Sequence, residues 1–317
     1  MITTITHGID LDGLGSQAII KRYLILKKNI KSKEITLKYA HYPTFLGKMK
    51  KILDSDPLPK RIYITDIGFN DDFEKLFPDL KELEEKGCKI FWFDHHIIEP
   101  KVESKLKKII TEYTNNSGQC TAEIVKRYFL PHDSVSHQIA EYASDIDFRT
   151  DKYHIAEKLQ SIISYNRGKK NYENRWKIVN YLVNGNFENQ WFEEQYEDLR
   201  ERKEKTMKKT LQNVEFFTLR HFGEFVISHA KEEGGIVCNY LKEKYPEIKT
   251  YIGIDERYNE VIIYSSEVDC REIAREFGGG GHKNRAGFKY PELINPISTY
   301  DPDFMKRLFQ LLLKYKF

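Results

Sequence analysis

Short runs of β-branched and aromatic residues alternate with helical patterns over the first part of the chain. The two periods predict strands over Ile2–Thr6, Arg61–Thr65 and Lys89–Phe93, and helices over Gly15–Lys28 and Asp71–Lys86. Strands that alternate with helices are typical of βαβ units, in which helices cover a mainly parallel sheet. We therefore predict an α/β domain at the start of the chain.

Each of these three strands runs directly into polar side chains. The first is followed by His7 and Asp10, the second by Asp66, and the third by Asp94-His95-His96. In open α/β sheets, ligands bind outside the carboxyl ends of the strands. We therefore expect these side chains to gather at one edge of the sheet.

The middle of the chain predicts further helices over Gln119–Phe129, whose start could face a ligand, and over Ser134–Ala143, which ends near Asp145. The segment from Phe187 to Gln212 lacks Gly and Pro, and its acidic residues precede its basic ones, as the dipole of one long helix favours. We interpret its charges as an ordinary solvated surface.

Shorter strands and helices follow this segment, which is typical of a smaller α+β domain. The sequence thus predicts a metal-binding catalytic domain over residues 1–186, a helical linker over 187–212 and a substrate-binding domain over 213–317.

Charge and cysteine usage narrow the class of protein. The 317 residues carry 51 basic and 48 acidic side chains, a net charge of +3, so an anionic ligand must be bound locally and not by a broad basic surface. No apolar run suits a membrane span and no signal peptide is evident, so we expect a cytoplasmic protein that binds no membrane. The four cysteines are far apart and lack a C-x-x-C pair, so we expect them reduced and buried.

Metal ligation is one interpretation of the polar groups at the strand ends. His7, Asp10 and Asp12 stand within one Gly-rich turn, and alternate carboxylates could serve two neighbouring ions. The simpler alternative is a polar turn in which Asp12 or Ser16 caps the next helix, and Asp66 could equally be a turn residue.

Asp94-His95-His96 is harder to explain without a ligand, because it follows the apolar run Ile90–Phe93 and its burial would be costly. Asp145, with Asp147 two residues on, offers a further carboxylate. Oxygen and imidazole ligands without sulfur suit Mn²⁺, Mg²⁺, Fe²⁺ or Co²⁺. Two such ions that share a carboxylate would activate a water for phosphoryl displacement.

A glycine run near the carboxyl end is the other candidate site. Its backbone could approach phosphate oxygens closely, with basic or donor side chains beside it; the alternative is a flexible turn. The candidate residues are Gly279, Gly280, Gly281, His282, Lys283 and Arg285.

The order of these motifs resembles the DHH phosphoesterase superfamily with its DHH-associated carboxyl-terminal domain, over nearly the whole chain. Within it, the chain looks most similar to the oligoribonucleases that degrade very short RNA, the nanoRNases. The string Asp94-His95-His96 after a strand and the distal Gly-Gly-Gly-His282 carry this resemblance.

The resemblance implies a role for each candidate residue. One metal ion would be bound by His7, Asp10 and Asp66, and the other by Asp12, Asp66, His95 and Asp145. Asp66 would bridge the two ions, and a bridging hydroxide would be the nucleophile. His96 would face the scissile phosphate, and Asp94 would orient a histidine. The loop Gly279–His282 would recognise a substrate phosphate or the terminal nucleotide.

The chain departs from the family pattern in two places. The family often has a Ser-x-Arg-Ser element before the glycine loop, whereas this chain has Ile263-Tyr264-Ser265-Ser266, so Lys283 or Arg285 would have to replace that arginine. The fourth motif holds two aspartates, of which Asp145 is the one that we prefer to Asp147.

The function implied is a Mn²⁺-dependent phosphodiesterase, active as a monomer or homodimer, that cleaves short single-stranded RNA or DNA to 5′-mononucleotides. Alternatives that share this chemistry are a cyclic mono- or dinucleotide phosphodiesterase, a 3′-phosphoadenosine 5′-phosphate (pAp) phosphatase, a RecJ-like exonuclease and an inorganic pyrophosphatase. A silent nucleotide-binding module is the alternative from another class.

Overall fold

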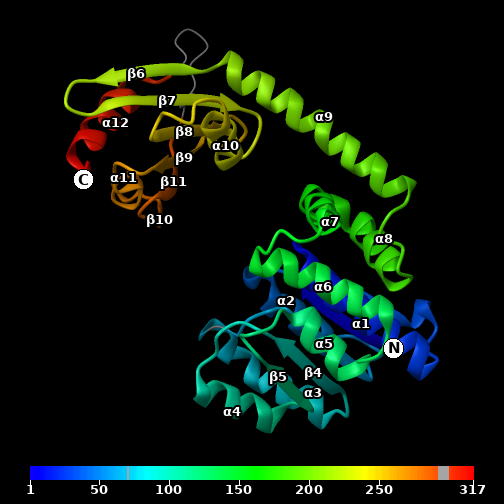
Figure 1. The fold of residues 1–317 in the computed structure, drawn as a ribbon. Helices are drawn as coiled ribbons and strands as arrows, with labels where there is room; N and C mark the ends of the chain where they lie inside the picture. The colour runs from blue at the N-terminus through cyan, green and yellow to red at the C-terminus, as the bar shows by residue number, and fades with distance from the viewer. Residues whose placement is uncertain (70, 292–299) are drawn as a thin grey trace. The chain divides into compact units, whose positions relative to one another are not determined.

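The computed structural model describes residues 1–69, 71–291 and 300–317, and the chain forms two compact units (Figure 1). The first unit is Met1–Glu197 and the second is Asp198–Phe317, so the division falls inside the helix α9, Gln190–Gln212.

The first unit is built on a parallel sheet with the strand order β2-β1-β3-β4-β5. Its strands are β1 Ile2–His7, β2 Ile35–Ala40, β3 Arg61–Thr65, β4 Lys89–Asp94 and β5 Glu112–Asn115. The prediction of a mainly parallel α/β domain is therefore confirmed. β2 and β5 were not among the predicted strands.

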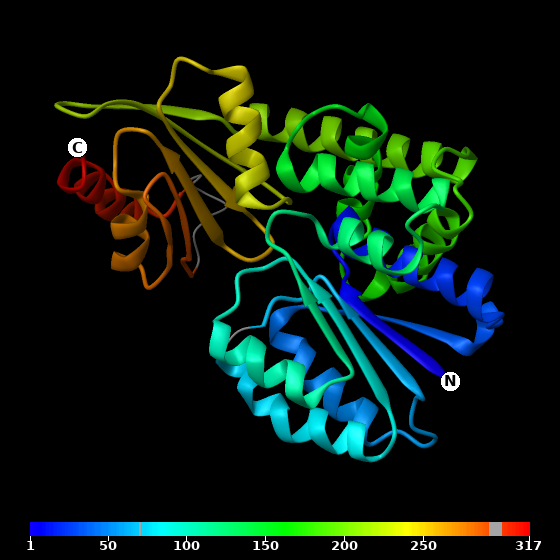
Figure 2. The ribbon, with the colours of Figure 1, turned by 60° about the horizontal axis from the view of Figure 1, so that its bottom comes forward.

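Helices cover both faces of this sheet (Figure 2). On one face lie α1 Leu11–Lys28, α5 Thr121–Phe129, α6 Ser134–Phe148, α7 His154–Tyr165 and α8 Tyr172–Val183. On the other face lie α2 Tyr42–Leu53, the 3₁₀ helix Asp71–Leu76, α3 Phe77–Glu85 and α4 Pro100–Ile109. Short 3₁₀ helices also occur at Ser32–Glu34 and Lys169–Asn171.

Successive residues of the central strands enter opposite cores. On β4, Trp92 packs in the core under α2 and α3, while Phe93 packs in the core under α1 and α5. The indole of Trp92 is fully buried and donates a hydrogen bond to the carbonyl of Ile67 at 3.0 Å. Burial on both faces explains the continuous apolar run Ile90–Phe93 of β4.

Two helices differ from the predicted bounds, and both differences bear on the site. α1 begins at Leu11, not Gly15, with Asp10 as its N-cap, so Asp12 lies on the helix and is not a cap. α6 continues to Phe148, past the predicted end at Ala143, so Asp145 lies within the helix. No Gly or Pro stands between Ala143 and Phe148 to end the helix earlier.

The second unit is an α+β fold, as predicted. Its sheet has the strand order β10-β11-β9-β8-β7-β6 and is antiparallel except where β7 pairs with β8. The strands are β6 Glu215–Leu219, β7 Gly223–Ala230, β8 Thr250–Asp255, β9 Glu260–Ser265, β10 Gly280–His282 and β11 Arg285–Lys289. Its helices are α10 Gly234–Lys244 on one face of the sheet, and α11 Cys270–Glu276 and α12 Pro302–Lys314 on the other.

Substitution of two glycines by alanine should change stability in opposite directions. Gly47 lies inside α2, and a Cβ at this position would have nothing within 4 Å, so Gly47→Ala should stabilise the first unit by about 0.5–1 kcal/mol. Gly253 on β8 is packed on α10, where a Cβ would lie 2.1 Å from the carbonyl oxygen of Gly234, so Gly253→Ala should destabilise the second unit by about 1–3 kcal/mol.

The three tryptophans, Trp92, Trp176 and Trp191, all belong to the first unit. Urea unfolding followed by tryptophan fluorescence should therefore register Gly47→Ala, while far-UV circular dichroism should register both variants. A fluorescence transition that shifts equally in both variants would contradict the assignment of Gly47 and Gly253 to two units that unfold separately.

Candidate metal centre

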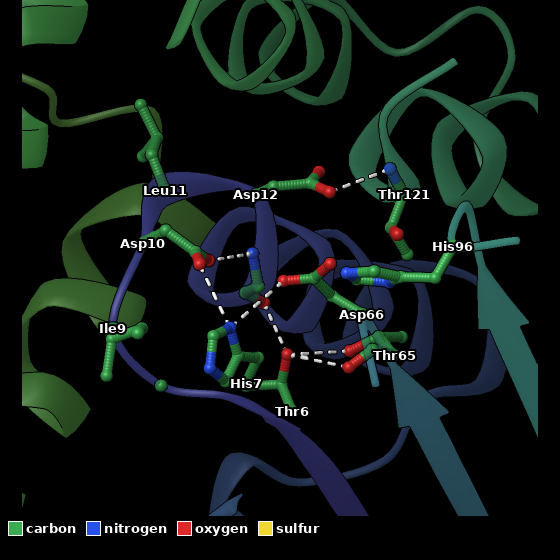
Figure 3. A network of polar contacts seen from close by, with 12 residues as sticks. Thr6, His7, Ile9, Asp10, Leu11, Asp12, Thr65, Asp66, His96 and Thr121 are labelled. Carbon is green, nitrogen blue, oxygen red and sulfur yellow. Dashed lines mark hydrogen bonds and ion pairs between the residues drawn. The ribbon is translucent and has the colours of Figure 1, made fainter. Parts of the chain in front are cut away.

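A tight turn after β1 brings His7 next to Asp10 (Figure 3). The Nδ1 atom of His7 lies 3.0 Å from Oδ2 of Asp10, whose Oδ1 accepts a hydrogen bond from the amide of Gly13 at 3.0 Å. A Cβ on Gly13 would lie 2.0 Å from the carbonyl oxygen of His7, so only glycine fits there. Burial opposes ionisation of Asp10, but the hydrogen bond and charge of His7 and the Gly13 amide lower its pKa overall.

Asp12 points from the first turn of α1 to the start of α5. Its two oxygens accept hydrogen bonds from the amides of Thr121 and Ala122 at 2.8 and 2.7 Å. The start of α5 was expected to face a ligand; it meets this buried carboxylate. Burial raises the pKa of Asp12 to about 6, with the charge of Asp10 adding to the rise while the amides and His95 oppose it.

Asp66 lies between two histidines. It follows β3 in the left-handed region with a φ of 54°, and its amide donates to the carbonyl of Phe93 at 3.1 Å. Its Oδ2 lies 3.8 Å from Nδ1 of His7, and its Oδ1 lies 3.5 Å from Nε2 of His95. Burial and the charges of neighbouring carboxylates hold the pKa of Asp66 well above its usual range. One carboxylate thus presents a separate oxygen to each histidine.

The end of β4 fixes His96. Asp94 is fully buried, and its Oδ1 lies 2.8 Å from Nδ1 of His96. This hydrogen bond raises the pKa of His96 against the opposing effect of burial. The side-chain amide of Asn115 donates to the carbonyl of His96 at 2.9 Å, so the position of the residue is held from two sides. Asn115 was not identified from the sequence, because it lies on β5, a strand that was not predicted.

The structure argues against the preference for Asp145. Its carboxylate accepts hydrogen bonds from Thr150 at 2.5 Å and from the amides of Lys152 and Tyr153 at 2.8 and 2.9 Å, so it fastens the turn after α6. These hydrogen bonds outweigh the effect of burial and lower the pKa of Asp145. Oδ2 of Asp147, in contrast, lies 3.4 Å from Nδ1 of His95.

The cause of this difference is the extension of α6. At 3.6 residues per turn, side chains two positions apart point about 200° away from each other, so only one of the two aspartates can face His95. The sequence predicted that this helix ends at Ala143. It therefore gave no indication that Asp145 and Asp147 would point in opposite directions from one helix.

Among the described residues, three groups of side chains bring their ligand atoms within 4.8 Å of one another, close enough to hold a metal ion. Asp66 belongs to two of the groups and His95 to two, and the groups are His7 with Asp10 and Asp66; Asp66 with His95 and His96; and Asp12 with His95 and Asp147. Oxygen and imidazole donors suit Mn²⁺ or Mg²⁺, and a divalent cation would offset the charge that raises the pKa of Asp66. The donor set therefore fits divalent metal ions.

The glycine run of the second unit has structural roles that its sequence did not reveal. Gly278 has a φ of +78° after α11, and a Cβ on Gly279 would lie 2.2 Å from the carbonyl oxygen of Gly287. Gly281 has a φ of +143° and packs on Ala286, within the short hairpin of β10 and β11. Gly280 alone of the run combines open space at its Cβ position with a φ outside the left-handed region. Gly280 is therefore the one glycine of the run that the fold does not explain, and the one that close approach of a ligand to the backbone would explain.

The three candidate side chains that follow the glycine run have different surroundings. His282 is exposed, and Nζ of Lys283 lies 3.9 Å from the centre of the Phe317 ring. The guanidinium of Arg285 lies 4.9 Å from the centre of the Tyr264 ring and lines a pocket of about 430 Å³ at the start of α10. The lining residues are Glu233, Gly234, Gly235, Asp255, Arg257, Tyr258, Glu260, Ile262 and Arg285.

The family model of the DHH family, N-terminal domain, matches residues 1–175. The chain belongs to the DHH family. It therefore belongs among the DHH phosphoesterases, as the order of motifs suggested. No curated protein sequence matches this DHH chain significantly.

Solved structures share the fold of this DHH protein across both units. A DHH-domain protein described as a member of a family of ribosomal proteins is 17% identical, with a TM-score of 0.65, and the match covers 100% of this chain and 87% of that one. The exonuclease RecJ bound to manganese is 14% identical with a TM-score of 0.57 (99% and 90% covered). The pGpG-specific phosphodiesterase PggH from Vibrio cholerae is 14% identical with a TM-score of 0.55 (99% and 98% covered).

Over residues 1–69, 71–291 and 300–317, none of the helices has the length and apolar character needed to cross a bilayer.

The two aspartates of α6 give a direct test of the revised assignment. Asp147→Asn should weaken Mn²⁺ binding at least about 10-fold, measured by calorimetry, with little change in thermal stability, because its carboxylate faces His95. Asp145→Asn should instead destabilise the first unit by about 1–3 kcal/mol and leave metal affinity nearly unchanged, because it removes hydrogen bonds within the turn. The opposite pattern would restore Asp145 as the ligand.

The glycine run yields a second paired test. Gly281→Ala should destabilise the second unit, because the backbone conformation is left-handed and Ala286 occupies the space. Gly280→Ala should keep native stability in thermal denaturation and raise KM for substrate if a ligand approaches this backbone. Unchanged KM in the stable Gly280→Ala variant would show that the run serves the fold alone.

Proposed function

We propose that this DHH protein is a metal-dependent phosphodiesterase that hydrolyses short oligonucleotides to 5′-mononucleotides with two divalent ions, Mn²⁺ first among them. The observation that carries the proposal is the position of Asp66, one oxygen of which faces His7 while the other faces His95. A carboxylate placed in this way suits a bridge between two ions.

In the proposed site, His7, Asp10 and Asp66 bind one ion, and Asp12, Asp66, His95 and Asp147 bind the other. Asp147 replaces Asp145 because of its contact with His95. Such a pair of ions lowers the pKa of a bound water and neutralises phosphate oxygens. The chain supplies the geometry: the amides at the start of α5 orient Asp12, and the Gly13 amide orients Asp10.

His96 acts on the substrate in this proposal. Its bond to Asp94 raises its pKa and thereby favours the imidazolium, which can donate to a nonbridging oxygen of the scissile phosphate. Since Asp94 is fully buried, it acts on the reaction by orienting His96 and stabilising its positive charge.

The second unit provides the candidate substrate-binding groups. Gly280 and His282 are exposed, and Arg285 lines a pocket of a size that suits a nucleotide portion. Arg285 stands opposite Tyr264 in the β9–β11 register, one position before the residue at which the family's arginine is missing. We therefore propose Arg285, held over the Tyr264 ring, as its replacement, while Lys283 lies against Phe317.

A short substrate is supported by the near-neutral charge of the chain, which lacks the excess of basic residues expected for a grip on long strands. The phosphodiesterase PggH, which is specific for the dinucleotide pGpG, matches this chain over 98% of its own length. We propose the cytoplasm as the location, where the four cysteines, free and buried, would stay reduced.

A substrate panel tests the proposal. With Mn²⁺, the protein should convert 5′-phosphorylated di- to pentanucleotides to 5′-mononucleotides, identified by mass spectrometry. Asp66→Asn should lose at least about 100-fold in kcat and bind Mn²⁺ more weakly, because both ions lose their shared ligand.

The panel also contains cyclic dinucleotides, cyclic mononucleotides, pAp and pyrophosphate. Turnover of one of these with no cleavage of short oligonucleotides would replace the proposed substrate. Nucleotide binding without any turnover, in a protein that binds Mn²⁺, would favour the silent module.

A further inference from the structure

A group of basic side chains lies beside His7, around the carboxyl end of β2. His41 follows β2 directly, is half-buried, and its ring centre lies 5.7 Å from that of His7 at an angle of 87°. This histidine has no role in the proposed hydrolysis. We call His41, Lys48, Arg167 and Arg175 the basic cluster.

Arg175 on α8 ties the cluster to the metal-binding turn. Its guanidinium donates to the carbonyl of Gly8 at 3.2 Å and to the carbonyl of Gly168 at 2.6 Å, and it lies over the rings of Tyr39 and Tyr172. Gly8 directly follows His7, and Gly168 directly follows Arg167. One buried side chain therefore holds the loop that carries Arg167 against the turn that carries a candidate metal ligand.

The cationic groups of Lys48 and Arg175 form their hydrogen bonds with neutral acceptors. Lys48 donates to the carbonyl of Tyr39 and, at 2.7 Å, to the hydroxyl of Tyr172. Among the described side chains, no carboxylate forms an ion pair with Lys48 or with the fully buried Arg175. A buried cation without a counter-charge is costly, and a nearby anion reduces that cost.

The electrostatic effect on His41 shows where these charges act. His7, Arg175, Lys48 and Arg167 all lie close enough to the ring of His41 to act on it electrostatically. The carboxylates Asp10 and Asp66 stand by the ring nitrogen of His7. The acidic metal centre and the basic cluster thus adjoin at His7.

We propose that the basic cluster is a second phosphate subsite, which binds the phosphate next to the scissile one in a short oligonucleotide. This inference rests on the proposed function for the identity of the substrate. His41 and the exposed Arg167 make the contacts, and the buried Arg175 and the half-buried Lys48 set the shape and the positive potential. A second phosphate bound here would position the scissile phosphate at the metal centre.

The two contact residues can be changed without disturbing the fold. The described hydrogen bonds of His41 are made by its backbone with Thr44 and Phe45, and the guanidinium of Arg167 makes one long bond of 3.4 Å to Ser164. Arg175 and Lys48 hold the structure and are left intact. The test variants are therefore His41→Gln and Arg167→Gln.

Lys27→Gln is the matched control. Lys27 is an exposed cation in the last turn of α1, whereas the metal centre lies at the first turn of this 18-residue helix, a length of about 27 Å. The control removes one positive charge far from the cluster, as Arg167→Gln does within it.

Steady-state kinetics should be measured for a dinucleotide without terminal phosphate, with a 5′-phosphate and with a 3′-phosphate. In the wild type and in Lys27→Gln, one of the two added phosphates should lower KM about 10-fold or more. His41→Gln and Arg167→Gln should lose most of that advantage while kcat on the unphosphorylated dinucleotide stays within about twofold. An advantage that persists in both variants, or an equal loss of kcat on all three substrates, would overturn the subsite.

A binding experiment separates this inference from the proposed reaction. Calorimetric titration with pyrophosphate, in EDTA to remove metal ions, should give at least about 5-fold weaker binding in both variants than in the wild type and the control. Equal affinity in all four proteins would overturn the anion subsite, even if oligonucleotides are hydrolysed. Cluster-dependent binding without hydrolysis of any oligonucleotide would support the subsite and contradict the proposed reaction.

Discussion

Crowded negative charge is the constraint on which the first unit depends. Asp10, Asp12, Asp66 and Asp94 stand at the carboxyl ends of neighbouring strands or just beyond them, and two of them, Asp12 and Asp66, carry pKa values raised by burial and by neighbouring carboxylates. Such a cluster opposes folding unless backbone amides and cations offset it. The amides of Gly13, Thr121 and Ala122 supply part of that compensation, and the donor geometry suits divalent ions for the rest.

The sheet supplies the rigidity that this arrangement requires. Because β3 and β4 are buried on both faces, with alternate residues in separate cores, a shift of either strand by one residue would exchange the two apolar sets. The left-handed backbone at Asp66 is held by the bond of its own amide to Phe93. The position of each carboxylate therefore follows from the packing of apolar residues behind it.

Much of this arrangement could be predicted from the sequence, because strand ends followed by Asp and His mark both the sheet and its functional edge. The prediction of site residues was weakest where the choice between two candidate ligands depended on the point at which a helix ends. Asp145 and Asp147 can be told apart only once α6 is known to continue through both. The structural roles of the glycine run were not predicted either, since Gly279 and Gly281 are explained by contacts with β11, which lie beyond the reach of local sequence patterns. Arg175 gave no local signal, because its acceptor in the metal-binding turn, the carbonyl of Gly8, lies 167 residues away in the chain.

The bond between Asp12 and the start of α5 also bears on the order in which the protein folds. It joins groups 109 residues apart in the chain, so the aspartate can reach its final orientation only after α5 has docked on α1. During synthesis, a nascent chain that ends before Thr121 would carry His7, Asp10, Asp66 and the two histidines after β4 without this support. Metal capture would then follow the folding of the domain and would not nucleate it, in contrast to small domains that fold around a metal ion.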